Sequence, residues 1–421
     1  MASTSVSGEL LAPKRIGIIG AGAVGLSCAI HLQRAGHRIE IFDPRDPGEG
    51  ASFGNAGIIA LSEVLPLGRP ATLRQIPHML ADPVGPLVIR WSYLPQILPW
   101  LCRFILASRA SEVSRISQAL ASILSMASGA WRDIVHGTGA ETRLVTNGWM
   151  RVYSGTRSFR LALADAERQR TLGVQVDVLN ADEIRQLEPA LLPAFIGATF
   201  CPEVSNVNSP VQVMRALAAV IRQQGGTFRK MAVNGIRRSP RPEVVDAEGG
   251  SKAFDRIIIA AGAWSRSLIR TLGVDLPLDT ERGYHVMLPM PSQPLRRPVS
   301  VASPGYTLVP MENGIRLTSG VEFAGLDAGP DFRRIRLMTA HAATVISGFK
   351  TPPLSEWLGF RPSMPHSLPV IGPIRSQPNI ILAFGHGHLG LTLGPVTGRL
   401  VATLIQGETS PIDLSPFLPT Q

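Results

Sequence analysis

The sequence predicts an α/β protein built around a parallel sheet. Residues 15–43 read as strand, glycine turn, helix and strand, which is the order of a βαβ unit. Residues 254–265 contain three consecutive isoleucines, which is typical of a strand buried on both faces. Residues 385–395 form a second glycine-rich turn between an apolar strand and a helix. With 421 residues, 45% of them hydrophobic and 17% charged, we expect a globular chain with two domains.

Residues 15–43 carry a dinucleotide-binding fingerprint. Gly20, Gly22 and Gly25 follow an apolar strand directly and are spaced as GxGxxG. In this context Gly20 permits a tight turn, Gly22 lets backbone N–H groups approach a pyrophosphate, and Gly25 lets helix and strand pack closely. Asp43 ends the second strand, where its carboxylate can accept hydrogen bonds from both ribose hydroxyls. The pattern predicts a dinucleotide without a 2′-phosphate and does not separate FAD from NAD. The structural alternative is a glycine-rich turn in an unrelated α/β protein.

Two further small-residue turns follow predicted strands. Residues 51–59 read ASFGNAGII, and Ala261 and Gly262 come directly after the isoleucine run. Small residues at such places let the backbone approach a ligand. For residues 51–59 an ordinary flexible loop explains the pattern equally well, and for Ala261 and Gly262 the alternative is a packing turn.

The charge is basic but dispersed. There are 41 basic and 31 acidic residues, a net charge of +10, and only four of the basic residues are lysines. No run of five or six basic residues occurs, so a nucleic-acid partner has little support. A solvated arginine-rich surface is the simpler interpretation, and attraction to anionic substrates or to an anionic membrane is the alternative.

The cysteines indicate a reducing compartment. Cys28, Cys102 and Cys201 lie far apart in the sequence, which argues against a disulfide scaffold or a zinc site. No signal peptide is expected, and residues 1–13 read as an extension before the first strand. We therefore expect a cytoplasmic protein without a bound metal. Peripheral binding at the inner face of the cytoplasmic membrane is the alternative location.

Residues 73–106 are apolar and interrupted by five prolines, so no stretch is long enough to span a bilayer. Five apolar residues recur at helical spacing, which usually indicates a packed face; they are Leu94, Ile97, Leu98, Leu101 and Ile105. A peripheral membrane contact is the alternative. A longer helix is expected over residues 112–135, and together these segments predict a helical insert. Farther along, residues 228–233 and 244–246 suggest a small antiparallel excursion.

The last seventy residues carry the second strong signal. Residues 359–373 read GFRPSMPHSLPVIGP, a proline-stiffened loop that contains Arg361. A guanidinium held in this way can bind a carboxylate through two parallel hydrogen bonds. The glycine turn at residues 385–395 then offers backbone donors at a helix N-terminus, as the first fingerprint does. Two such sites far apart in sequence suggest one long cofactor.

The ordered motifs IGIIGAGAVG, SFGNAG, AAGAWS, GFRP and GHGHLGLTLGPVTGRL together resemble those of the FAD-dependent D-amino-acid oxidase and dehydrogenase superfamily, and bacterial D-amino-acid dehydrogenases most of all. The resemblance implies a glutathione-reductase-type FAD-binding Rossmann domain, formed by residues 14–72, 155–280 and 355–421. It also implies a mixed-sheet substrate domain with the helical insert, formed by residues 73–154 and 281–354.

The resemblance assigns site residues by position. Arg361 would anchor the substrate carboxylate with help from Tyr306, and His388 and Tyr284 would complete the catalytic group. Residues expected to bind FAD are Gly20, Gly22, Ala23, Val24, Gly25, Asp43, Pro44, Ser52, Gly54, Asn55, Ala56, Gly57, Val233, Ala261, Gly262, Trp264, Gly359, Arg361, Gly387, His388, Leu389, Gly390, Leu391 and Thr392. No cysteine follows Cys201, which excludes a flavin thioether in the C-terminal region, and non-covalent FAD is expected.

The implied reaction is oxidative deamination of a D-amino acid by hydride transfer from Cα to flavin N5, giving an imino acid and then a 2-oxo acid. Cyclic secondary amines such as D-proline and D-hydroxyproline are included among the expected substrates. A quinone or respiratory-chain acceptor would reoxidise the flavin. The alternatives are a glycine or sarcosine type of amine oxidase that uses O₂, a NAD-dependent dehydrogenase, and a binding protein with structural FAD.

The chain departs from its relatives at two places. They often carry Asp-Gly where this chain has His366 and Ser367, and often threonine where it has His388. Both changes are expected near the flavin and substrate pocket, so the resemblance does not identify the substrate.

Overall fold

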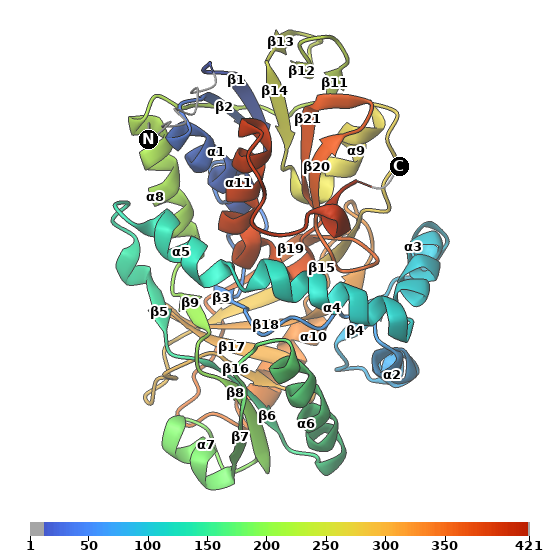
Figure 1. The fold of residues 1–421 in the computed structure, drawn as a ribbon. Coiled ribbons are helices and arrows are strands. Elements are labelled where there is room, and N and C mark those ends of the chain that lie inside the picture. The colour runs from blue at the N-terminus through green and yellow to red at the C-terminus, as the bar shows by residue number, and fades with distance from the viewer. Residues whose placement is uncertain (1–11, 420–421) are drawn as a thin grey trace, which may run out of the picture.

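The computed structural model describes residues 12–419, whose strands form two large and two small sheets (Figure 1). The extension predicted over residues 1–13 lies almost wholly outside the described residues. Cys28, Cys102 and Cys201 are all free thiols, as the sequence predicted.

The first large sheet has six strands in the order β10-β2-β1-β14-β21-β20. Their bounds are β1 Arg15–Ile19, β2 Arg38–Asp43, β10 Thr227–Lys230, β14 Arg256–Ile259, β20 Val370–Ile374 and β21 Gln377–Phe384. All neighbours pair parallel except β20 with β21. Ile18 on the central strand β1 aligns with Ile41 on one side and Ile258 on the other, and all three are fully buried. The predicted βαβ unit and the re-entering isoleucine strand are confirmed.

Helices α1 (Ala23–Arg34), α8 (Pro210–Gln223) and α11 (Gly390–Gln406) lie together beside this sheet (Figure 1). Gly398 lets α1 and α11 approach closely, because a Cβ there would lie 2.5 Å from the backbone of Ser27. The helix α9 (Ser265–Arg270) lies on the other side of the sheet.

Strand β10 corrects one prediction. Residues 228–233 were expected in an antiparallel excursion, but β10 pairs parallel with β2 at the edge of the six-stranded sheet. The excursion consists of β11 (Gly235–Arg237), β12 (Glu243–Val245) and β13 (Ser251–Ala253). A short strand does not show in its own sequence which sheet it joins.

The second large sheet has nine strands, with β4 (Leu87–Ile89) added to β18. The other strands, in spatial order, are β19 Ser355–Ser363, β15 Asp279–Leu288, β18 Gly314–Phe323, β17 Tyr306–Met311, β16 Val299–Val301, β6 Trp149–Tyr153, β8 Gly197–Cys201 and β7 Asp177–Asn180. The helices α6 (Thr156–Thr171), α7 (Ala181–Leu187) and α10 (Arg333–Ala342) accompany it. A small sheet of β3 (Ile58–Ile59), β9 (Ser205–Val207) and β5 (Leu144–Thr146) lies between the two large ones.

Sheet membership differs from the segment boundaries expected for the two domains. Strands β7 and β8 were assigned to the FAD-binding segments through residues 155–280, and β19 through residues 355–421. All three belong to the nine-stranded sheet. We propose that residues 149–201 and 355–363 belong to the substrate domain, because their backbone hydrogen bonds are made there.

The predicted helical insert consists of α2 (Pro70–Ala81), α3 (Leu94–Ala107), α4 (Ala110–Leu124) and α5 (Ala127–Val135). The helix expected over residues 112–135 is therefore two helices. On α3, Ile97 is buried, whereas Leu98 is 52% exposed and Ile105 is 54% exposed. The packed-face prediction is correct for Ile97 and wrong for Leu98 and Ile105, because α3 lies at the side of the molecule (Figure 1). Among the helices of residues 12–419, none combines the length and apolar character of a transmembrane span.

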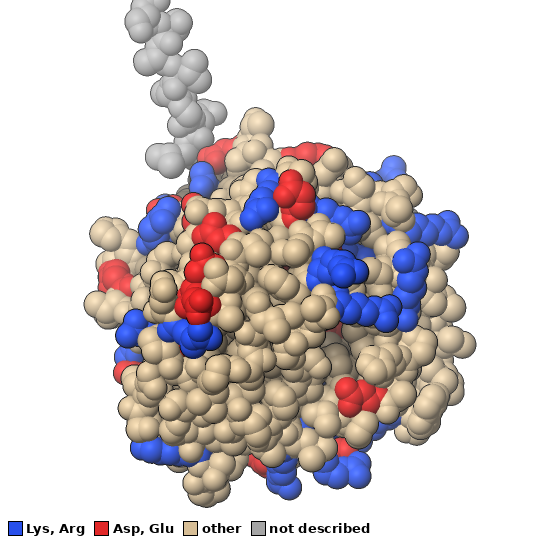
Figure 2. Space-filling model, turned by 90° about the horizontal axis from the view of Figure 1, so that it is seen from below, with Lys and Arg blue, Asp and Glu red and all other residues tan. Residues whose placement is uncertain are grey.

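Figure 2 shows the end of the molecule that carries α6 and α7. On this face the lysine and arginine side chains lie in separate groups, with acidic side chains near some of them and a broad uncharged area between. The dispersed charge expected from the sequence is seen on this face.

Candidate active site between the two large sheets

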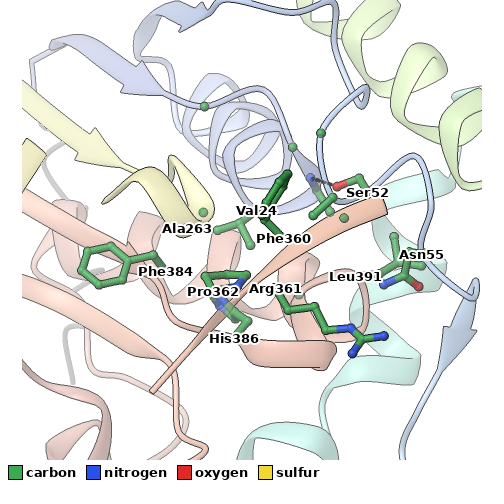
Figure 3. Close-up of a pocket in the computed structure, with 18 of the residues that line it drawn as sticks. Val24, Ser52, Asn55, Ala263, Phe360, Arg361, Pro362, Phe384, His386 and Leu391 are labelled. Atoms are coloured by element: carbon green, nitrogen blue, oxygen red, sulfur yellow. Dashed lines mark hydrogen bonds between the residues drawn. The ribbon is translucent and has the colours of Figure 1, made fainter. Parts of the chain in front are cut away.

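A cavity of about 730 Å³ is lined by residues of both large sheets (Figure 3). It brings together most of the predicted site residues, namely Gly20, Gly22, Ala23, Val24, Asp43, Pro44, Ser52, Gly54, Asn55, Ala56, Val233, Ala261, Gly262, Trp264, Tyr284, Gly359, Arg361, Gly387, His388, Gly390 and Leu391. The predicted residues outside its lining are Gly25, Gly57, Tyr306, Leu389 and Thr392.

The glycine fingerprint forms a tight cradle at one end of the cavity. Gly20 has φ 109°, and a Cβ there would lie 2.3 Å from the carbonyl oxygen of Ala260. A Cβ on Gly25 would lie 1.9 Å from the carbonyl oxygen of Gly20. Gly25 therefore acts behind the cavity wall, where helix α1 meets strand β1.

Asp43 is fixed at the end of β2. Its Oδ2 accepts the N–H of Ala21 at 2.9 Å, and its Oδ1 accepts the N–H of Arg45 at 2.9 Å. These two bonds hold the carboxylate beside the glycine turn, and its other lone pairs can accept ribose hydroxyls. The guanidinium of Arg45 lies over the ring of Trp264, 4.9 Å from its centre, so both side chains border this end of the cavity.

The N-terminus of α1 faces the same cavity. Ser52 accepts the N–H of Ala23 at 3.0 Å, which is the bond drawn in Figure 3. The first N–H groups of a helix have no partner within the helix, and the helix dipole favours an anion there. The second glycine turn, η4 (Gly387–Leu389), leads into α11 and provides a further helix N-terminus.

The loop of residues 51–57 is held by the nine-stranded sheet. A Cβ on Gly54 would lie 2.0 Å from the ring of Trp357, and the Gly54 carbonyl lies 3.1 Å from Nδ1 of His285. His285 stacks on Trp357 with ring centres 5.0 Å apart. Burial lowers the pKa of His285 to about 3, so its ring is neutral at neutral pH. The loop is therefore ordered by packing and is not an ordinary flexible loop.

Arg361 lies on strand β19, whereas the sequence predicted a loop. Its Nη1 donates to the carbonyl of Gly320 at 2.8 Å, and its Nη2 donates to the carbonyl of Ser319 at 3.4 Å. The guanidinium packs against Gly283, where a Cβ would lie 2.3 Å from Nη2 of Arg361. Burial lowers the pKa of Arg361, and nearby Glu281 opposes this effect. The guanidinium of Arg361 has five N–H groups, so it retains free donors beyond its two bonds to the carbonyls.

Tyr306, predicted to help Arg361, does not line the cavity that contains Arg361. Its hydroxyl lies 3.0 Å from Nδ1 of His341 on α10, on the face of the sheet away from the cavity. The next residue, Thr307, lines the cavity because successive side chains of a strand point to opposite faces. Tyr284 borders the cavity, but its hydroxyl is bonded to the Glu322 carboxylate and to the N–H of Asp331.

The other three residues outside the lining have supporting positions. Thr392 Oγ1 accepts the N–H of Ala60 at 3.0 Å and donates to the carbonyl of Ile58 at 3.3 Å. Leu389 is buried in the core, and Gly57 is the turn residue that hydrogen-bonds with Val207. They shape the cavity wall without lining it.

Sequence reasoning missed several polar and aromatic residues of the lining. Glu63, Trp149, Thr307 and Thr318 border the end of the cavity where Arg361 and His388 lie. None belongs to a recognisable motif, and Trp149 and Glu63 come from segments more than eighty residues apart. Only their pairing in space identifies them.

The residues present fit FAD. A dinucleotide is a long ligand and needs binding groups at several places. The cavity offers two helix N-termini, an acid for the ribose, and glycines whose missing Cβ atoms leave room for tight turns of the backbone. Arg361 and His388 lie at the other end, where a substrate would be held.

Comparison with known proteins agrees with this arrangement. A family model described as DAO, FAD dependent oxidoreductase, matches residues 15–404. The chain is 37% identical over 419 residues to a D-amino-acid oxidase of Bradyrhizobium diazoefficiens, covering 97% of this chain and 99% of that one. It is 25% identical over 396 residues to a D-amino acid dehydrogenase of Helicobacter pylori, covering 93% and 95%. The fold is similar to the crystal structure of glycine oxidase from Geobacillus kaustophilus, with a TM-score of 0.74, 23% identity and coverage of 97% and 99%.

Proposed function

The chain belongs to the DAO family of FAD dependent oxidoreductases, and from this premise we propose that it oxidises D-amino acids to imino acids, which water hydrolyses to 2-oxo acids and ammonia. FAD is the cofactor. The 37% identity to a D-amino-acid oxidase over nearly the whole chain supports the choice of substrate class. The observation that carries the proposal is a half-buried guanidinium, Arg361, in the same cavity as the glycine cradle.

We assign the nucleotide half of FAD to the cradle of Gly20 and Gly22, to Asp43 and to the N-terminus of α1. When bound, FAD supplies the acceptor for the Cα hydride at N5. The chain itself orients the substrate. Arg361 holds the α-carboxylate through charge-assisted hydrogen bonds, and the carbonyls of Ser319 and Gly320 fix the plane of its guanidinium. Such positioning contributes several kcal/mol to catalysis in general.

The test is anaerobic bleaching of the flavin by D- and L-forms of a panel of amino acids, with glycine, sarcosine, D-proline and D-hydroxyproline included. Bleaching by D-amino acids but not by their L-forms is the expected result. Bleaching by glycine and sarcosine alone would favour the alternative, an amine oxidase. A purified protein that binds no FAD would contradict both.

Arg361→Lys tests most directly whether Arg361 binds the substrate carboxylate. Lysine keeps the positive charge but lacks the planar fork, so kcat/KM for the best substrate should fall by about 10² or more, because hydrogen bonds to charged groups contribute about 1.5–3 kcal/mol each. FAD content should stay the same. An unchanged kcat/KM in Arg361→Lys and in Arg361→Ala would contradict the role of Arg361 as the anchor.

The electron acceptor separates an oxidase from a dehydrogenase. We propose a quinone as the acceptor and the inner face of the cytoplasmic membrane as the place of action. Support comes from the side of the molecule at α3, where Trp91 is 78% exposed and Leu98, Ile105 and Leu106 are each at least 50% exposed. Oxygen consumption compared with reduction of a quinone analogue tests the acceptor. The membrane contact is tested with anionic liposomes. The wild type should bind them, and the double variant Leu98→Glu, Ile105→Glu should not. Wild-type protein that stays unbound would contradict the membrane contact.

A further inference from the structure

The end of the cavity that holds Arg361 also contains a chain of paired side chains. Nε2 of His388 lies 3.9 Å from Oε2 of Glu63, and Oε1 of Glu63 accepts a hydrogen bond from Nη2 of Arg151 at 2.9 Å. The guanidinium of Arg151 lies over the ring of Trp149, 5.1 Å from its centre. His388 is thus the last member of a row that begins at Trp149, and it borders the cavity together with Glu63.

The backbone segments that carry His388 and Glu63 are fixed to each other. Thr392, two residues into α11, bonds through its hydroxyl to the backbone of Ala60 and of Ile58, just before Glu63. Glu63 and His388 also line a second cavity of about 20 Å³, together with the other residues of the η4 turn. Glu63 and His388 therefore line both the main cavity and this small one.

The charges around His388 make it the member that can change its protonation state. The charged and titratable groups that face Glu63 and His388 from the packed elements are Arg69, Arg151, Glu281, Arg361 and His386. Burial lowers the pKa of His388; Glu63 opposes this effect, and Arg361 and Arg151 add to it. His388 is therefore neutral at neutral pH and has a free lone pair on its ring.

The neighbours of His388 are less suited to accept a proton. Burial opposes the charge of Glu63, but Arg151 and His388 hold its pKa below the ordinary value, so it stays ionised and paired. Burial lowers the pKa of His386 to about 3, and its Nε2 is bonded to Thr397 at 2.9 Å. Burial raises the pKa of Glu281, which lies beside Arg361 and outside the main cavity lining.

An amino acid at neutral pH carries an ammonium group, which has no lone pair to assist departure of the Cα hydride. One proton must leave that nitrogen first. We propose that His388 accepts this proton and that Glu63 and Arg151 position its imidazole for the task. The N–H bond breaks, its electron pair stays on the amine nitrogen, and the proton bonds to the lone pair of the imidazole. Glu63 then stabilises the imidazolium. This role rests on the proposed oxidation of amino acids.

The test is the pH profile of kcat/KM between pH 5 and 10 for the D-amino acid that bleaches the flavin fastest. In the wild type kcat/KM should rise as His388 loses its proton and then stay level through neutral pH. In His388→Gln only substrate that is already a free amine can react. Its kcat/KM should be about 10²-fold lower at pH 7, as for loss of a placed base. It should climb tenfold per pH unit towards the wild-type value at high pH.

Glu63→Gln tests the positioning role. Glu63 raises the pKa of His388. Loss of the Glu63 carboxylate should therefore move the acidic limb of the pH profile to lower pH and reduce kcat/KM in the level region of the profile. A residue that only supported the fold would lower kcat/KM equally at every pH. FAD content and thermal stability of each variant are measured alongside.

A binding measurement separates proton transfer from carboxylate binding. Propionate has a carboxylate and no amine, and its Kd is measured from the change it causes in the flavin absorption spectrum. His388→Gln should bind propionate as the wild type does, whereas Arg361→Lys should bind it more weakly.

Three results would overturn the proton-acceptor role of His388. They are a loss in His388→Gln that is the same at every pH, no loss at pH 7, and a wild-type profile that climbs tenfold per pH unit throughout the range. Where His388→Gln fails to fold, His388→Asn and the wild-type profile decide the question. If no amino acid bleaches the wild type, the proposed function fails and this role fails with it; bleaching with any of the three results leaves the proposed function standing.

Discussion

Gly283 controls the position of the Arg361 guanidinium, which leads to a prediction that separates function from folding. In Gly283→Ala the new Cβ would lie 2.3 Å from Nη2, 2.5 Å from Cζ and 3.0 Å from Nε of Arg361. A Cβ atom essentially never lies closer than 3.0 Å to another heavy atom, so the guanidinium must move by roughly 1 Å. A misplacement of that size costs about 10²-fold in rate. We therefore expect kcat/KM to fall by about 10²-fold.

The fold should tolerate the same substitution. The three atoms nearest to the new Cβ all belong to the end of the long Arg361 side chain, which can turn aside. FAD content should be unchanged, and the free energy of unfolding should change by less than about 1.5 kcal/mol. The assays are steady-state kinetics with a bleaching D-amino acid, flavin absorbance per protein, and urea denaturation.

Gly129→Ala is the matched control. Gly129 lies in helix α5, and within residues 12–419 a Cβ there would have no atom within 4 Å apart from its own chain neighbours and nearby helix backbone. This variant should keep the wild-type kcat/KM and gain about 0.5–1 kcal/mol of stability, since alanine is the better helix former. A Gly283→Ala variant that keeps the wild-type kcat/KM, or that loses activity only because it loses FAD or its fold, would refute this role of Gly283.

Three other predictions concern the cradle, a strained turn and pH. Gly25→Ala should lower stability by about 1–3 kcal/mol and weaken FAD binding, because its Cβ would lie 1.9 Å from the Gly20 carbonyl oxygen; unchanged melting temperature and FAD Kd would argue against this. Ser367 has φ 60°, so Ser367→Gly should raise the free energy of unfolding by up to about 1 kcal/mol in urea denaturation, and a loss would contradict it. Burial lowers the pKa of His285 and His386 to about 3, whereas the unfolded chain takes up these protons near pH 6.5. Stability present above pH 6.5 should therefore be lost progressively as pH falls towards 3. A melting temperature equal at pH 7 and pH 5 would count against this.

The nucleotide end of the site was predictable because its information is local. Gly20, Gly22 and Asp43 lie within one βαβ unit, and the spacing of the unit determines which backbone groups meet. The paired strands β1 and β2 then place Asp43 beside the glycine turn without help from the rest of the chain.

The membership of strands was not predictable in the same way. Strand β10 joins the six-stranded sheet and strand β8 joins the nine-stranded one, yet both are short segments with mixed polarity. Pairing partners far away in the sequence decide the sheet, and the segments themselves carry no sign of those partners. The same limit explains why α3 was expected to be packed, although its neighbours leave Leu98 exposed.

Which residues reach the substrate end of the cavity depends on which face of the sheet each side chain points to. Neighbouring residues of a strand point to opposite faces, so a shift of one residue changes the face. Tyr306 and Thr307 are adjacent on β17, yet Tyr306 contacts α10 and Thr307 faces the cavity. A motif that identifies the strand does not identify which of the two faces the ligand. Glu63 is harder still to identify, because its proposed role depends on Arg151 from strand β6 and on His388 from the C-terminal turn. The residues that would choose and activate the substrate are therefore those that only the assembled sheets reveal, and variants at Glu63 and His388 test the structure more severely than variants in the glycine fingerprint.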